Sequence, residues 1–131
     1  MCFGCGSRNA RGLQLTFELD ASRRRMTTRW TPTKDLQGYA DIVHGGMTAL
    51  VLDELMVNLL WKLAWPAVTG ELAVRFHRPA RVGHPLTCEA HVQEAAGRLI
   101  RMRASATDAA GTVVATATAR CVRLPHGRID G

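Results

Sequence analysis

The sequence predicts one α+β domain, in which an antiparallel sheet wraps around a single long helix. One uninterrupted apolar segment, Met47 to Trp65, lies between segments that alternate apolar and polar residues. The segments that follow it are joined by connections too short for parallel crossovers, so they must pair antiparallel. A chain of 131 residues with 47% apolar and 21% charged residues has the size and balance of one globular domain.

Two strands are predicted before the long apolar segment. Leu13 to Leu19 alternates apolar and polar residues, which is the period of a half-buried strand. A polar turn from Asp20 to Arg24 leads into a second short strand, Met26 to Trp30. Lys34 to Gly46 contains Gly38, Gly45 and Gly46 and is expected to be a loop.

Met47 to Trp65 is predicted to be a helix. The segment is rich in Leu, Ala and Met and contains neither Gly nor Pro, and Pro66 ends it. Because the segment is apolar nearly all round, the helix cannot simply lie on a surface and must be wrapped by other elements.

Four strands are predicted after the helix, as a meander with hairpin turns at Gly97 and at Ala110-Gly111. They cover residues 68–76, 85–93, 98–107 and 112–122. One sheet curled around one helix is the simplest packing of these elements, and it leaves a face or an edge partly bare. A bare edge favours pairing with a second copy of the chain. Residues 1–124 are expected to form this domain and 125–131 a loose C-terminal tail.

Charge and patterning narrow the classes of function. The formal net charge of +6 suits an anionic partner, such as a phosphate-bearing cofactor, nucleic acid or acidic lipid, without choosing among them. No basic stretch followed by an apolar run opens the chain, and four polar residues interrupt the longest apolar stretch, so neither a secretory signal nor a membrane span is expected. Reduced thiols in a cytoplasmic setting are therefore expected.

A short basic run, Ser22 to Arg25, lies in the turn between the first two predicted strands. No aromatic platform or recognised DNA-binding module accompanies it. A solvated hairpin is the preferred interpretation, and no nucleic-acid partner is expected.

Asp53 stands out among the polar residues of the helix. Glu54, Asn58 and Lys62 recur every four residues and form one stripe, which we expect to face solvent or an interface. Asp53 lies outside this stripe, and its helical neighbours are Ala49, Leu50, Met56 and Val57. A carboxylate in such company is desolvated, which is unfavourable unless the group is used or paired. Three interpretations are open at this point: Asp53 reaches out to water, pairs with a distant arginine, or has a functional role.

The segment His44-Gly45-Gly46 stands just before the predicted helix. Glycines let the backbone approach a ligand closely, and free N–H groups at a helix start polarise a carbonyl oxygen. Asp53 lies nine residues after His44, which along a helix is roughly 13 Å at ~1.5 Å per residue. The two cannot flank one scissile bond, so if both are catalytic, Asp53 of one chain must meet the glycine turn of another. This hypothesis requires a dimer.

At these residues the chain resembles a known family. Short segments spread from Cys2 to Val122 match, in order, the hotdog-fold acyl-CoA thioesterases of the PaaI type, especially the branch that opens with Cys-Phe-x-Cys-Gly. The matching segments are Cys2-Phe3-Gly4-Cys5-Gly6, Gly12-Leu13-Gln14-Leu15, Gln37-Gly38-Tyr39, Ile42-Val43-His44-Gly45-Gly46, Leu52-Asp53-Glu54, Thr69-Gly70-Glu71-Leu72-Ala73-Val74-Arg75-Phe76, Arg78-Pro79 and Gly83. The ordered combination is specific, although no single segment is.

The resemblance implies a hotdog fold, an obligate dimer and hydrolysis of acyl-CoA to a free acid and coenzyme A. It implies that the Gly45 N–H polarises the thioester carbonyl, while Gly46 shapes the turn or adds a second donor and His44 orients it. Asp53 from the other subunit is then the nucleophile or general base. Thr69 matches the family's hydroxyl position and would orient the attacking water or support Asp53.

Four further residues are assigned to substrate binding. Gln37 lies seven residues before His44, close to where related branches place an Asn or Gln, whereas the residue six before is Gly38. Arg75, Arg78 and Arg81 lie at and beyond the end of the strand that starts near Thr69, and arginines pair well with phosphates. They are candidates for the nucleotide end of coenzyme A.

The cysteines do not predict a metal. Cys2 and Cys5 form a CxxC, but zinc needs four ligands, and Cys88 and Cys121 are lone residues in predicted strands. No metal and no separate cofactor are therefore expected, since coenzyme A is part of the substrate. The expected partners are acyl-CoA and a second copy of the chain, as a homodimer or a dimer of dimers, with no membrane partner.

Two other functions remain open. One is a non-catalytic acyl-CoA-binding or assembly protein on the same fold. The other is a hotdog dehydratase or isomerase, which would need a His paired with an acid to transfer protons to and from a carbon atom. Asp53, Gly45 and Thr69 together favour the thioesterase, and the sequence leaves the acyl group open.

Overall fold

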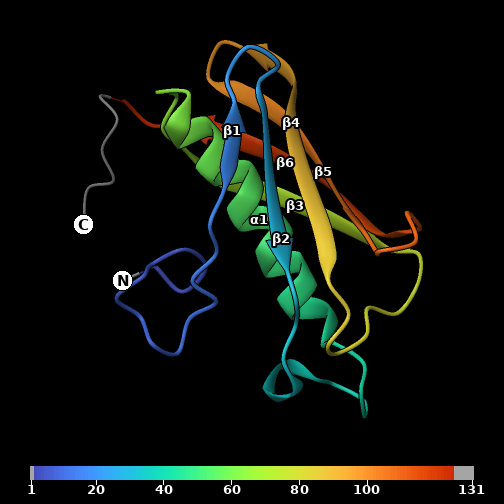
Figure 1. Cartoon of the computed structure of the whole chain (residues 1–131). Coiled ribbons are helices and arrows are strands. Elements are labelled where there is room, and N and C mark those ends of the chain that lie inside the picture. Colours follow the sequence, from blue (N-terminus) through green and yellow to red (C-terminus); the bar gives the residue numbers. More distant parts are fainter. Residues whose placement is uncertain (1, 126–131) are drawn as a thin grey trace.

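One six-stranded antiparallel sheet packs against one long helix in the computed structural model, which describes residues 2–125 (Figure 1). The elements in chain order are β1 (Glu18–Asp20), β2 (Arg25–Trp30), the 3-10 helix η1 (Lys34–Leu36), α1 (Gly45–Lys62), β3 (Ala67–Phe76), β4 (Leu86–Ala96), β5 (Leu99–Thr107) and β6 (Val113–Arg123). This arrangement confirms the predicted α+β class. Apart from Pro125, the predicted tail 125–131 lies outside the described residues.

The strand order is β1-β2-β4-β5-β6-β3, and every pair is antiparallel. The predicted four-strand meander is therefore wrong in one respect, because β3 pairs with β6 rather than with β4. The free edge of β4 is already taken by β2, so β3 lies at the far edge of the sheet. Among residues 2–125, this position leaves one side of the strand that carries Thr69 without a pairing strand.

The helix begins and ends earlier than predicted. It starts at Gly45 because His44 caps it, so both glycines belong to its first turn and not to the preceding loop. It ends at Lys62, and Ala64 adopts a positive φ of 62°. Trp65 N–H then donates to the Leu60 carbonyl at 2.8 Å, which closes the helix end in the manner of a Schellman motif.

The first predicted strand, Leu13 to Leu19, is mostly not a strand. Only Glu18 to Asp20 pairs with β2. Leu13 and Leu15 instead donate their N–H groups to the carbonyls of Phe3 and Gly4, and Gln14 between them has a positive φ of 52°. The alternation of apolar residues is real, since Leu15 is buried, but the segment pairs with the N-terminal loop and not with the sheet.

The core lies between the helix and the facing side of the sheet. Seven helix residues are buried, and the strands facing them contribute mainly small or aliphatic side chains. The buried helix residues are Thr48, Val51, Leu52, Leu55, Met56, Leu59 and Leu60. Packing on this scale holds α1 rigidly along the sheet, which fixes the residues at its start and middle.

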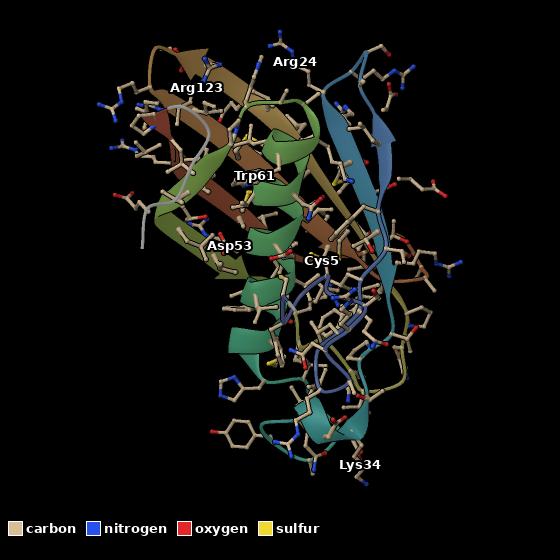
Figure 2. All side chains as sticks on the ribbon, turned by 90° about the vertical axis from the view of Figure 1, so that its left-hand side faces the viewer. Cys5, Arg24, Lys34, Asp53, Trp61 and Arg123 are labelled. Carbon is tan, nitrogen blue, oxygen red and sulfur yellow. The ribbon has the colours of Figure 1, made fainter. Side chains whose placement is uncertain are left out.

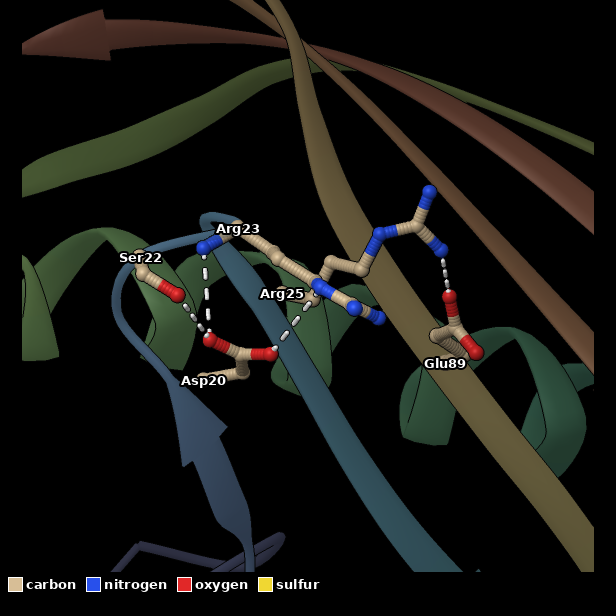
Figure 3. Close-up of polar contacts among 5 residues, drawn as sticks. All are labelled: Asp20, Ser22, Arg23, Arg25 and Glu89. Carbon is tan, nitrogen blue, oxygen red and sulfur yellow. Dashed lines mark hydrogen bonds and ion pairs between the residues drawn. The ribbon is translucent and has the colours of Figure 1, made fainter.

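The arginines of the β1–β2 turn have partners within the chain (Figure 3). Asp20 Oδ1 accepts hydrogen bonds from Ser22 Oγ at 2.8 Å and from Arg23 N–H at 3.3 Å, and these bonds, the first above all, lower the pKa of Asp20. The Arg23 side chain also reaches Asp20, and Arg25 pairs with Glu89 on β4. The turn fits the solvated hairpin inferred from its sequence.

The remaining turn arginine, Arg24, lies over the Trp65 ring, 4.7 Å from its centroid, and Arg123 lies over the same ring at 4.9 Å. Cation–π contacts therefore tie the β1–β2 turn and β6 to the segment that follows α1. Trp61, by contrast, is 43% exposed. Among residues 2–125, no helix combines the length and the apolar character needed to cross a membrane.

Candidate active site

The first turn of α1 presents one uncommitted amide. His44 is the N-cap residue, and its Nδ1 accepts a hydrogen bond from the Gly46 N–H at 3.0 Å. An accepting Nδ1 carries no proton, so a neutral His44 holds its proton on Nε2. Within residues 2–125 no hydrogen bond is recorded for the Gly45 N–H. Gly46 therefore shapes the turn, and Gly45 is the residue whose N–H is available to a carbonyl oxygen.

A cavity of about 430 Å³ opens beside Gly45. Its lining is mostly apolar and comes from the segment before α1, the first turn of α1, the end of β3, the segment after β3, and Val114 at the start of β6. A Cβ atom on Gly45 would lie 3.2 Å from the Phe76 ring, so the glycine lets the backbone reach the cavity wall. Tyr39 and Phe76 line the cavity and are 84% and 52% exposed. The cavity therefore has an aromatic wall that is open to solvent in this chain.

Asp53 is paired inside the chain, but not with an arginine. Its Oδ1 accepts a hydrogen bond of 2.6 Å from Thr69 Oγ1, and the carboxylate is half-buried. Figure 2 shows Asp53 on the flank of α1 nearer β3. Since Oδ1 is held by Thr69, the second carboxylate oxygen remains available to a water molecule or a substrate atom.

A bulge in β3 places Thr69. The β3–β6 register shifts between Thr69 and Glu71, and a Cβ on Gly70 would meet the Arg120 carbonyl at 3.4 Å. Bulges re-aim side chains beside functional sites. Cys121 is the β6 partner of Thr69, and burial is the main reason that its pKa rises to about 11, with the negative charge of Asp53 adding to the rise.

Gly45 and Asp53 lie on one continuous helix, separated by eight residues. At ~1.5 Å per residue the two backbones are about 12 Å apart along the axis. The structure therefore brings Asp53 to Thr69 and Gly45 to the cavity, but it does not bring these two pairs together within one chain.

Gln37 helps to close a loop. Its Oε1 accepts a hydrogen bond from the Asp41 N–H at 3.1 Å, and its backbone pairs with Val43. The Gly38 N–H donates to the Ile42 carbonyl within the same loop. These contacts give the Gln37 side chain a structural role beside the expected role in substrate binding.

The three candidate arginines lie in different places. Arg78 lines the cavity beside Gly45. Arg75 lies with Arg103 and Thr116 along a separate surface hollow. Arg81 forms an isolated backbone bridge with Ile42. Of the three, Arg78 alone shares a cavity with Gly45, so the structure does not gather them as one phosphate site.

The polar stripe of the helix is covered and not open. Cys2 Sγ donates to Glu54 Oε1 at 3.3 Å, and Asn58 Nδ2 donates to Cys5 Sγ at 3.6 Å. Burial, followed by hydrogen bonds with Glu54 and Cys2, raises the pKa of the Cys5 thiol to about 12. The expectation of a solvent-facing or interface stripe therefore holds only for Lys62, which is exposed.

Sequence reasoning missed several residues of these sites. Phe76 and Tyr39 at the cavity, and Cys121 beside Thr69, carry no local signal that separates them from core residues. The spacing of Glu54 with Asn58 and Lys62 predicts a solvent-facing or interface stripe, and it does not reveal the contact of Glu54 with Cys2, 52 residues earlier in the chain. A glycine-containing CxxC turn was the one available signal for that contact.

An antiparallel sheet wrapped around one long helix defines a hotdog fold. The family model of the thioesterase superfamily matches residues 40–115, a segment that includes Gly45, Asp53 and Thr69. The chain belongs to this superfamily. No curated protein sequence matches the chain.

Solved structures share the fold. A thioesterase superfamily protein is 27% identical with a TM-score of 0.84; the match covers 89% of this chain, which spans 60% of that protein. The Escherichia coli PaaI protein from the phenylacetic acid degradation operon is 18% identical, with a TM-score of 0.79 and coverage of 86% and 81%. A hypothetical thioesterase protein from Streptococcus pneumoniae, solved with coenzyme A, is 16% identical, with a TM-score of 0.77 and coverage of 83% and 87%.

Proposed function

We propose that the protein is an acyl-CoA thioesterase that hydrolyses a thioester to a free acid and coenzyme A. The observation that carries this proposal is that one helix presents both groups that the reaction needs: an open Gly45 amide at an apolar cavity, and the Asp53 carboxylate, which Thr69 supports. Membership of the thioesterase superfamily and the coenzyme A bound by the S. pneumoniae protein support the substrate class. The free thiols of the described residues suit a cytoplasmic location, which stays a prediction.

In the proposed reaction the Gly45 N–H donates a hydrogen bond to the thioester carbonyl oxygen and stabilises the negative charge that develops there. As a general base, Asp53 takes a proton from a water molecule that attacks the carbonyl carbon. The tetrahedral intermediate collapses, the C–S bond breaks, and the coenzyme A thiolate leaves. As a nucleophile, Asp53 attacks the carbonyl carbon, the C–S bond breaks with loss of the coenzyme A thiolate, and water then hydrolyses the resulting acyl anhydride. Thr69 holds Asp53 in either route.

The two groups come from different subunits in this proposal. The separation of about 12 Å between Gly45 and Asp53 along α1 exceeds what one thioester group needs. The unpaired edge of β3 and the exposed aromatic wall of the cavity both support a second copy at this side. A dimer, or a dimer of dimers, would bring Asp53 of one chain to Gly45 of the other.

The proposal is tested by a hydrolysis screen over short, medium, long and aryl acyl-CoAs, with release of the free thiol as the readout. We expect turnover of at least one class, and the preferred class identifies the acyl group. Tight binding of acyl-CoA without any turnover would instead support a non-catalytic acyl-CoA-binding protein. Product retained as an unsaturated or isomerised acyl-CoA would support a dehydratase or isomerase.

Replacing Thr69 by Val should lower kcat by about tenfold, because it removes a hydrogen bond to a charged carboxylate while it keeps the branched shape. Thr69→Ser keeps the hydroxyl and should restore most of the activity. Thr118→Val, on the exposed side of β6, is the matched control and should behave as wild type. An inactive Thr69→Ser variant would show that the methyl group matters more than the bond to Asp53.

The active species should be at least a dimer. Light scattering of the purified protein, combined with activity across a dilution series, measures the oligomeric state and its link to turnover. We expect activity per chain to fall as the assembly dissociates. A monomer with full activity would contradict the two-subunit site.

A further inference from the structure

The N-terminal loop brings two thiols and a carboxylate together on the side of α1 away from Thr69. Cys2 Sγ, Cys5 Sγ and a Glu54 carboxylate oxygen all lie within 4.8 Å of one another. Asn58, one helical turn after Glu54, donates to Cys5 Sγ at 3.6 Å. Figure 2 shows Cys5 in the loop beside α1. None of these side chains has a role in the proposed hydrolysis.

The loop is shaped for this close approach. Gly6 N–H donates to the Cys2 carbonyl at 2.9 Å, which curls the CxxC segment into one turn. A Cβ on Gly4 would lie 2.6 Å from Glu54 Cγ, and a Cβ on Gly12 would lie 2.4 Å from the Phe3 carbonyl oxygen. Gly12 therefore needs to be glycine for the loop to close on itself, whereas a side chain at Gly4 would displace the Glu54 side chain from its place beside the thiols. The cluster is built by the backbone around it.

We propose that Cys2, Cys5 and Glu54 bind a zinc ion. Zinc accepts mixed sulfur and oxygen ligands in a tetrahedral arrangement, at ~2.3 Å for sulfur and about 2.0–2.2 Å for oxygen. At a tetrahedral angle two sulfur ligands of one such ion lie about 3.8 Å apart, so the present cluster, whose ligand atoms lie within 4.8 Å of one another, closes around the ion by side-chain rotations that shorten these separations by up to about 1 Å. Thiolates disfavour calcium and magnesium, which prefer oxygen ligands. Water or the Asn58 side-chain oxygen takes the fourth position.

The ion holds structure and takes no part in catalysis. Glu54 faces the N-terminal loop, whereas the adjacent Asp53 bonds Thr69 on β3. An ion on Glu54 therefore fastens the loop to the middle of α1 without facing the thioester. The sequence expectation of no metal rested on two cysteine ligands, and Glu54 supplies the third. The proposed hydrolysis uses Gly45, Asp53 and Thr69 and needs no metal ion.

The test starts from chelated, reduced protein. Zinc affinity is measured by competition with a chromophoric chelator, and cobalt(II) replaces zinc to reveal thiolate ligands through their charge-transfer absorption. We expect one ion per chain, thiolate-to-cobalt bands, and a melting temperature that rises with zinc. The variants Cys2→Ser, Cys5→Ser and Glu54→Gln should lose the bands or weaken binding at least tenfold. Cys88→Ala, which removes a buried thiol of β4, is the matched control and should keep both the cobalt bands and the zinc affinity.

Some results would overturn the zinc site. These are the failure to compete with the chelator, cobalt bands that keep their full intensity in Cys5→Ser with unchanged affinity, and a Cys2–Cys5 disulfide in protein prepared under reductant. Hydrolysis is followed in the same samples, so the two proposals are tested separately. Zinc binding without turnover removes the thioesterase proposal alone, and turnover without zinc binding removes the zinc site alone.

Discussion

Asp53→Asn should lower kcat by about 10²–10⁴, the range for loss of a general base. Asparagine keeps the size of the side chain and still accepts the hydrogen bond from Thr69, but it cannot take a proton from water. Folding should change little, since an amide is cheaper to bury than a carboxylate. Steady-state kinetics with the preferred acyl-CoA should show the loss on kcat, with KM largely kept.

The control for this variant is a carboxylate far from the site. Glu94→Gln, on the exposed end of β4, removes the same charge and should leave kcat within a factor of about two. Both variants are compared after light scattering confirms the same assembly. Wild-type activity in Asp53→Asn together with loss of activity in Glu54→Gln would mean that Glu54, and not Asp53, is the catalytic carboxylate.

Gly45→Pro should lower kcat by about 10²–10³, the effect of removing one oxyanion donor. Gly45 is the first helical residue, where proline fits because its missing N–H has no intrahelical partner. His44 before it has φ −57° and ψ 127°, a conformation that a following proline accepts. The substitution therefore removes the amide hydrogen and keeps the helix. Gly45→Ala is the matched control, because it brings a similar contact with Phe76 and keeps the N–H.

These two variants together test whether the site is shared between subunits. In a mixed dimer of an Asp53→Asn chain and a Gly45→Pro chain, one of the two sites contains both intact groups. Random mixing should then restore about one quarter of the wild-type activity, although each variant alone is nearly inactive. If no activity returns on mixing after subunit exchange is verified, both groups act within one chain and the two-subunit site is wrong.

Local patterns in the sequence predicted the fold because they act over short distances. The apolar segment around Leu55 and the alternation in the four later strands determine helix and strand without reference to the rest of the chain. The places where prediction failed depend on contacts across the fold. Pairing of β3 with β6 depends on β2 occupying the edge of β4, and Leu13 and Leu15 bond a loop that no periodicity reveals.

The candidate site was predictable in composition but not in geometry. The resemblance assigned Asp53, Gly45 and Thr69 from their order and spacing, and the hydrogen bond between Thr69 and Asp53 agrees with one of the two roles given to Thr69. The hydrogen bond from the Gly46 N–H to His44 Nδ1 depends on the side-chain rotamer of His44, which cannot be predicted from the sequence. Glu54 beside Cys2 and Cys5 is a contact across 52 residues, and spacing rules for metal ligands do not reach that far.

Because Gly45 and Asp53 lie on one unbroken helix, the helix fixes the distance between them inside a chain. If each site combines Gly45 of one helix with Asp53 of another, the distance between these two residues in the site depends on the alignment of one subunit against the other. If the strands that pair across the interface shift by one residue, Gly45 of one subunit moves by ~3.3 Å relative to Asp53 of the other. A displacement near 1 Å already costs about 10²-fold in rate. Substitutions on the outer edge of β3, remote from any substrate, should therefore behave in kinetics as if they were changes to the reacting groups themselves.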